Sequence, residues 1–284
     1  MSGIAVVIVL VVVTVGLTFL LLALIRRMFS QEELEFNNQT VGNYLAIISV
    51  VYGVFLAFVI LVLWEQRDRA DEHVETEAAE LNFLFHISLE FPDPLRSDLL
   101  GAIRTYDNNV INVECPYMVR RELKSLYARN PAIDAIWELL AHSRPSSEAE
   151  QALRTQALDV SEKIYIARRM RLLDAGKSLG PYLWMIVIVG GIATIFPTLF
   201  THVRSFAFLV VTKSCTVLVL LLVMYTIHDL QGPFQGSWRV KPDAYILDLE
   251  RMDAVLQQRA QEAKPGGAVV TTPSIQKQSL QAPR

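Results

Sequence analysis

The stretch from Val41 to Gln66 most constrains the fold, because it is an apolar run long enough to cross a lipid bilayer as one helix. Its Trp64 suits the headgroup layer, and the chain turns abruptly charged just after it. No proline follows until Pro92, and no glycine lies between Gly53 and that proline. The pattern therefore predicts a helix that leaves the membrane and continues into water.

Composition and three further apolar runs predict a membrane protein with four spans. The mean hydropathy of +0.33 is too high for a soluble domain. The charged middle of the chain, however, excludes a protein that lies in the membrane over its whole length. We predict an all-α protein that crosses the membrane at residues 4–25, 41–64, 182–201 and 205–227. The first run is too long for a cleaved signal peptide and ends at Arg26 and Arg27, so we expect it to be retained. A short polar connection, Met28 to Thr40, should join the first two spans in a hairpin.

Residues 65–180 should form a cytosolic helical region continuous with the membrane helices. Their apolar residues recur at helical spacing in stripes that predict a bundle, with prolines at 116, 131 and 145 between shorter pieces. Three of these stripes are Ala70, Val74, Ala78, Leu81 and Phe85; Leu95, Leu99, Ile103, Tyr106 and Val110; and Leu153, Ala157, Val160, Ile164 and Ala167. Residues 228–263 indicate a turn followed by an amphipathic helix, and the composition of residues 264–284 is typical of a disordered tail.

Basic residues near the span ends predict that both termini are cytoplasmic in a multi-pass protein of the cell membrane. With that orientation eight lysines and arginines lie inside and three outside. Two of the three, Arg26 and Arg27, favour the opposite orientation. The eight are Arg67, Arg69, Arg168, Arg169, Arg171, Lys177, Arg239 and Lys241.

Charge and motif content argue against several classes of function. A net charge of -3 gives no basic footprint for nucleic acid, and Cys115 and Cys215 form neither a disulfide framework nor a zinc site. His73, Glu77 and Glu80 have a spacing that could hold a metal, but a surface pair is the stronger interpretation. We expect no metal, no cofactor and, without a catalytic constellation, no enzymatic activity.

Three polar or small-residue features each have two interpretations. Ser49, Gly53 and Ala57 form a small-residue face that favours close approach of helices, either around an axis or within one subunit. Lys213 lies in an apolar run, where it either attracts anions or marks the membrane surface. The acidic run after Trp64 would either favour cations at the mouth of a ring or form a solvated helix face. That run comprises Glu65, Asp68, Asp71, Glu72, Glu75, Glu77 and Glu80.

Several segments carry a resemblance to a known family. The end of the second span, with Gly53, Trp64 and Gln66, resembles a helix of bestrophin channels, and PFQG at 233–236 resembles their Pro-Phe-Gly turn. Over residues 40–245 the chain more closely resembles the bestrophin-like family of bacterial and plant membrane proteins. Beyond the exit at Trp64, that likeness lies in Glu77-Ala78, Tyr106, Glu114 to Met118, Arg171-Leu172, Pro181, Trp184, Gly190-Gly191 and Asp229 to Pro242.

The resemblance implies a homo-oligomer, a pentamer by analogy, that conducts small ions through a pore lined by the second spans. It implies an apolar neck at Ala46, Val50 and Val54, and a turn at Pro233, Phe234 and Gly236. Bestrophins have an acidic calcium clasp after this turn, whereas this chain reads SWRV at 237–240, so calcium gating is not implied. The alternative is a non-conducting membrane scaffold or sensor that binds a partner through its cytosolic helices.

Overall fold

The computed structural model describes residues 3–29, 31–122, 124, 131–201, 203 and 205–262. Within these ranges the protein is built from helices and contains no strand, which confirms the all-α prediction. The predicted disordered tail at residues 264–284 lies outside the described residues.

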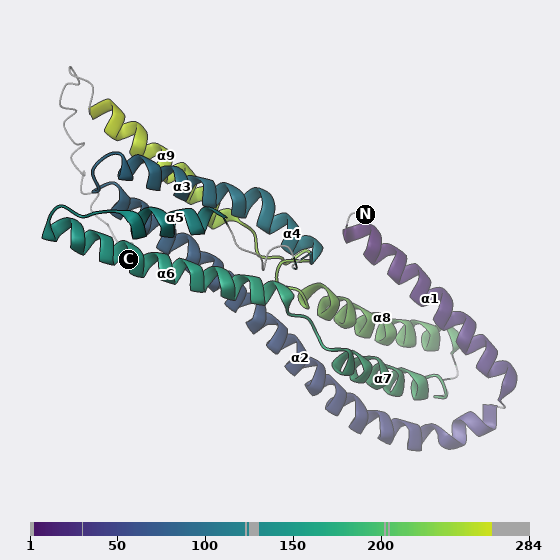
Figure 1. The fold of residues 1–284 in the computed structure, drawn as a ribbon. Helices are drawn as coiled ribbons and strands as arrows, with labels where there is room; N and C mark the ends of the chain where they lie inside the picture. The colour runs from purple at the N-terminus through teal and green to yellow at the C-terminus, as the bar shows by residue number, and fades with distance from the viewer. Residues whose placement is uncertain are drawn as a thin grey trace, which may run out of the picture.

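One helix, α2 (Gln31–Ser88), runs through the whole molecule (Figure 1). It has 58 residues and is therefore about 87 Å long at 1.5 Å per residue. The prediction that the second membrane helix continues without a break into the polar region is confirmed. Most of the polar connection predicted from Met28 to Thr40 is helical, because residues 31–40 hold no glycine or proline and form the start of α2.

Two apolar helices pack against the first half of α2, and a third packs on one of these two. α1 (Gly3–Met28) contacts α8 (Phe206–Leu230), while α7 (Pro181–Thr198) and α8 both contact α2. Four helical segments are long and apolar enough to cross a membrane, which confirms the prediction of four spans. α7 ends one residue after Pro197, as expected of a proline that cannot continue the hydrogen-bond ladder.

Four other helices form a bundle with the second half of α2 and bury the predicted stripes. They are α3 (Leu95–Asn109), α5 (Pro131–His142), α6 (Glu148–Gly176) and α9 (Asp243–Glu262). Three of them contact α2, and α5 packs on α3 and α6. α6 makes the most extensive contact with α2, and α3 lies against α5 and α9. The core confirms the periodic pattern, since Ala70, Val74, Leu81, Leu99 and Ile164 are all buried in it.

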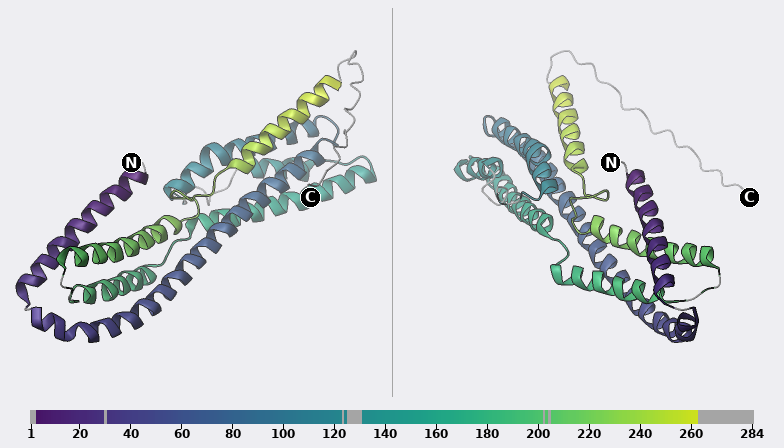
Figure 2. Two further views of the ribbon diagram at one scale, coloured as in Figure 1. Left: turned by 180° about the vertical axis from the view of Figure 1, so that it is seen from behind. Right: turned by 90° about the vertical axis from the view of Figure 1, so that its right-hand side faces the viewer.

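The membrane helices and the bundle lie at opposite ends of α2, and the two views of Figure 2 agree on this. α1 starts on the bundle side of the apolar helices and runs away from the bundle, and α2 returns toward it. The molecule is therefore an elongated rod with an apolar end and a polar end, joined by a single continuous helix.

A π-helical turn, Val110–Glu114, joins α3 to α4 (Cys115–Arg120) without a break. The expectation that Pro116 interrupts the helix is wrong. Pro116 stands in the first turn of α4, where its missing N–H has least effect, and the wider π turn precedes it. Glu114, the last residue of the π turn, is buried, so this irregular turn brings a carboxylate into the bundle.

Candidate functional site

The predicted neck residues lie on an exposed face of α2. Ala46, Val50 and Val54 are four residues apart and so share one side of the helix, and Val50 and Val54 are 67% and 52% exposed. The opposite side of α2 is buried against α7 and α8, where Tyr52 and Leu56 lie in the core. The neck face therefore has no covering helix among the described residues.

The same exposed face continues out of the apolar zone as a line of carboxylates. Leu61 follows Val54 by seven residues, about two helical turns, and Glu65, Asp68 and Glu72 continue at spacings of three or four, and all four are exposed. We call Ala46, Val50, Val54, Leu61, Glu65, Asp68 and Glu72 the α2 stripe. The sequence predicted its apolar and acidic parts separately, but its spacing also shows that they share one face.

The small-residue face lies beside the stripe and is exposed too. Ser49, Gly53 and Ala57 are all exposed in the subunit, and a Cβ built on Gly53 would meet no atom within 4 Å. A small-residue face allows close approach of a neighbouring helix, and here the space for that neighbour is open.

Lys213 lies elsewhere, on α8, and is half-buried. It stands inside the apolar stretch Phe206–Leu230, two turns after the helix begins. Among the described residues no ion pair joins it to a carboxylate, and the structure does not bring it to the acidic part of the α2 stripe.

A buried ionic cluster holds the bundle together at its centre. Arg171 on α6 donates from Nε to Glu77 Oε2 at 2.8 Å and from Nη2 to Glu77 Oε1 at 2.9 Å. The same Nη2 donates to Glu114 Oε2 at 2.6 Å, and Arg168 donates to Glu114 Oε1 at 2.9 Å. Tyr106 completes the set by donating its hydroxyl to Glu77 Oε1 at 2.6 Å. The cluster therefore links α2, α3, the π turn and α6.

Burial and charge determine the protonation of this cluster. The two arginines lower the pKa of Glu114 despite its burial, so this carboxyl is ionised, and its carboxylate compensates the arginine charges. Burial and the nearby Glu77 carboxylate raise the pKa of Tyr106 well above its usual value, so its phenol remains a proton donor. Because its charged groups are paired in this way, the cluster stabilises the packing of the bundle rather than forming a reactive site.

The cluster overturns one expectation about its members. The predicted surface pair of His73 and Glu77 is wrong, because Glu77 is fully buried and His73 Nδ1 lies 2.6 Å from Asp174 Oδ2. Over the described part of the chain, no group of three or more histidines, cysteines or acidic residues could hold a metal ion. Glu77, Tyr106, Glu114 and Arg171 are among the residues that carried the family resemblance, but no sequence pattern predicted that they meet in space.

A second feature of the bundle is a buried carboxyl without a partner. Asp107 on α3 is fully buried, and neither of its oxygens has a hydrogen-bond partner among the described residues. Burial, with the nearby Asp248 and Glu77 carboxylates, raises its pKa to about 8. Sequence reasoning missed this residue, since an aspartate between polar neighbours on an amphipathic helix is usually exposed.

The turn after α8 is shaped by a glycine. Pro233 and Phe234 are buried, and Gly236 has a left-handed φ of 71°. Both carboxylate oxygens of Asp229 accept from the Ser237 N–H, at 3.0 and 3.1 Å, and a Cβ on Gly236 would overlap that carboxylate. Only glycine suits this position, because it combines positive φ with close approach of another side chain.

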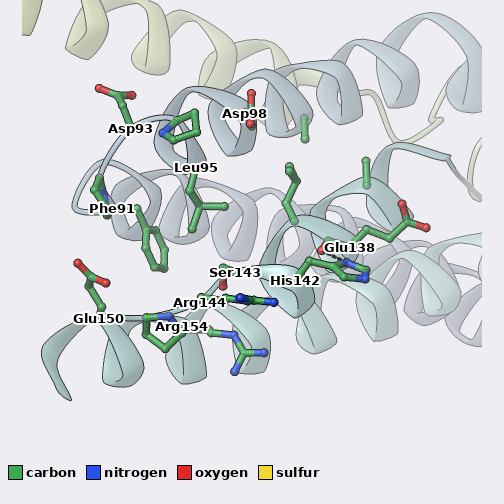
Figure 3. A pocket seen from close by; sticks show the side chains of 16 residues that line it. Phe91, Asp93, Leu95, Asp98, Glu138, His142, Ser143, Arg144, Glu150 and Arg154 are labelled. Atoms are coloured by element: carbon green, nitrogen blue, oxygen red, sulfur yellow. Dashed lines mark hydrogen bonds between the residues drawn. The ribbon is translucent and has the colours of Figure 1, made fainter. Parts of the chain in front are cut away.

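The far end of the bundle carries a groove of about 790 Å³ between α3, α5 and the start of α6 (Figure 3). Phe91, Leu95 and Leu139 give it apolar walls. Charged side chains from both sides line it, including Asp98, Glu138, Arg144 and Arg154. Arg154 is held by Leu140 and Ala141, whose carbonyl oxygens accept at 2.8 and 3.1 Å. A groove of this size and mixed character could receive a peptide segment or a small molecule.

Comparison with known proteins gives one family. The searches of curated proteins and of solved structures each returned no significant match. The model of the bestrophin-like domain matches residues 8–245, which contain all four apolar helices, the buried cluster and the glycine turn. The family prediction is confirmed, and the protein is a membrane protein that belongs to the bestrophin-like family.

Proposed function

We propose that the protein is a homo-oligomeric channel for small ions in which the α2 stripe of each subunit faces a common axis. The observation that carries the proposal is the exposure of this stripe, with valines in the apolar zone and carboxylates beyond it. If apolar and charged residues were mixed along this face, the stripe would not be divided into an apolar part and an acidic part.

Each part of the stripe has a role in this channel. A ring of Val50 and Val54 side chains would form an apolar constriction that can close to ions by dewetting. Glu65, Asp68 and Glu72 would stack as acidic rings at the adjoining mouth and favour cations there. The small-residue face at Gly53 lets neighbouring α2 helices approach closely.

The arrangement in the membrane is part of the proposal. A cyclic oligomer, a pentamer by resemblance to bestrophins, brings equivalent faces around one axis. We place the protein in the cell membrane with both termini and the bundle in the cytoplasm, as the excess of basic residues near the bundle favours. Lys213 on α8 then lies away from the axis, so we assign it no part in conduction.

Ion flux through proteoliposomes tests the channel. Val54→Lys places a charge in the neck and should change flux at least tenfold or reverse the ion preference. Val219→Lys on α8 is a matched control, because Val219 is 58% exposed and lies off α2. Native mass spectrometry should give the mass of an oligomer with more than two subunits, as a ring requires. A monomer or dimer, or a flux that both lysine variants change equally, would overturn the proposal.

A membrane scaffold or sensor is the second candidate, and the groove of Figure 3 is the observation that favours it. Such a protein would use the groove for a partner and its spans only as an anchor. Wild-type liposomes with no flux above protein-free liposomes, together with loss of partner capture in Leu95→Glu, would favour the scaffold.

A further inference from the structure

We propose that the hollow between α4 and residues 234–243 binds the phosphate-containing headgroup of an anionic phospholipid. The proposal does not depend on ion conduction, because no residue of the α2 stripe lines this hollow.

Two tryptophans mark the level of this hollow relative to the bilayer. Trp64 and Trp238 contact edge to face, with ring centroids 5.9 Å apart. Arg67 joins the same group, since its Nε donates to the Trp238 carbonyl oxygen at 2.6 Å. Tryptophan concentrates in the headgroup layer of membranes, so the segment that follows Trp238 lies at that layer as well.

The hollow itself has a volume of about 400 Å³ and two kinds of wall. Apolar side chains, Ile111, Val119 and Phe234, form one part, and the cationic side chains of Arg120, Arg239 and Lys241 form the other. α4 is attached to the opposite wall, because Gln235 Nε2 donates to the Val119 carbonyl oxygen at 3.2 Å. Cationic and apolar walls together match a lipid headgroup with its first acyl carbons.

The charge in this hollow is not neutralised by the protein. Arg120, Arg239 and Lys241 form no ion pair with any carboxylate in the described ranges, and Asp243 is the one acidic residue in the lining. A neighbouring hollow shares Arg239 and Lys241, but it also contains Asp71 and Glu75. The excess of positive charge therefore faces the α4 side, where an anion would be bound.

The chemistry identifies a phosphodiester, which could come from a lipid or from a soluble phosphate. Basic pockets next to membrane helices bind anionic lipid headgroups, and each nearby lysine or arginine strengthens the attraction. The apolar wall and the level set by the tryptophans favour the lipid, because a free phosphate gains nothing from Phe234 or Val119. We assign the site to an anionic lipid in the leaflet on the bundle side.

The test uses the purified full-length protein, stripped of lipid in detergent and titrated with single lipids by native mass spectrometry. Wild type should bind phosphatidylglycerol at least tenfold more tightly than phosphatidylcholine. Arg239→Gln with Lys241→Gln should reduce phosphatidylglycerol affinity about tenfold. The matched control is Arg251→Gln with Lys163→Gln, which removes two exposed charges that line neither of the two hollows and should leave affinity unchanged.

Three results would overturn the assignment. The first is a wild type without preference for phosphatidylglycerol, the second is a control that loses as much affinity as the site variant, and the third is binding of the deacylated headgroup glycerophosphoglycerol as tight as that of the lipid. The last result would assign the site to a soluble phosphodiester. If the double variant does not fold, Arg120→Gln provides the same test from α4, with several-fold weaker phosphatidylglycerol binding expected.

Discussion

Arg171 on α6 and Glu77 on α2 form a two-pronged ion pair at 2.8 and 2.9 Å, with both side chains fully buried. The geometry fixes the rotation and the axial register of α6 against α2, because both N–H groups must meet both carboxylate oxygens. Tyr106 and Glu114 then attach α3 and the π turn to the same pair. The bundle is therefore specified by one polar constellation as well as by its apolar core.

Removing Arg171 should destabilise the protein strongly. Arg171→Met leaves Glu77 and Glu114 buried near each other without their main counter-ion, and breaking one side of such a pair costs about 3–5 kcal/mol of unfolding free energy. Denaturant or thermal unfolding in detergent measures the loss. Arg169→Met is the control, since Arg169 is exposed on the same helix and should change stability by less than about 0.5 kcal/mol. Equal stability of both variants would contradict the role of the pair.

Asp107 should make the bundle less stable as pH rises. Its pKa is about 8 in the folded state, against an ordinary value near 3.8, so the folded protein holds a proton that the unfolded chain has released. The contribution of this group to the free energy of unfolding therefore falls as pH increases from about 4 to about 8 and is constant above that.

Asp107→Asn tests this linkage because the amide stays neutral at every pH. We expect the variant to be more stable than wild type at pH 8 by about 1 kcal/mol or more, and the difference to shrink toward pH 5. Melting temperatures measured from pH 5 to pH 9 provide the readout. Asp98→Asn, at an exposed position on the same helix, should follow wild type. Parallel pH profiles for wild type and Asp107→Asn would exclude a protonated Asp107.

Gly190 on α7 should not tolerate a larger side chain. A Cβ at this position would overlap the Tyr52 ring, whose hydroxyl donates to the Val187 carbonyl oxygen at 2.5 Å. Gly190→Val should therefore lower stability by about 1–3 kcal/mol through overpacking between α2 and α7. Thermal unfolding in detergent should show the loss, while Gly42→Val, where the space is open, should leave the melting temperature nearly unchanged.

The acidic part of the α2 stripe should set the ion preference of the proposed channel. Replacing Glu65, Asp68 and Glu72 together by Gln, Asn and Gln removes three carboxylates per subunit and should shift the reversal potential away from cation preference. Planar bilayer recordings in a salt gradient measure this shift. The control removes three exposed carboxylates elsewhere: Asp98→Asn, Glu138→Gln and Glu162→Gln. An identical reversal potential in the triple variant and wild type would exclude the stripe as the selectivity element.

The sequence was sufficient to predict the helices but not the contacts between their polar side chains. Burial of Ala70, Val74 and Leu81 follows from spacing alone, because a helix repeats every 3.6 residues and its apolar face must be covered. The start of α2 at Gln31 was missed, since a polar segment without glycine or proline can be either loop or helix. Pro116 was misjudged because it stands in the first turn of α4, directly after a π turn that no local pattern predicts.

The candidate sites show the same limit. The α2 stripe could be recognised from the sequence, because all its members lie on one helix at regular spacing. Arg171 and Glu77 lie 94 positions apart, and only tertiary structure brings them together. Asp107 has an unremarkable sequence context, and its missing partners become visible only when the surrounding side chains are placed.

Because α2 is unbroken, a movement at one end of this helix displaces its other end. A rigid tilt of roughly 5° about its membrane end would move its other end by up to about 8 Å, since a helix of 58 residues measures about 87 Å along its axis. Phe91 follows the end of α2 by three residues and forms a wall of the far groove. A ligand that displaced Phe91 in that groove would therefore act on the end of the same helix that carries Val50 and Val54.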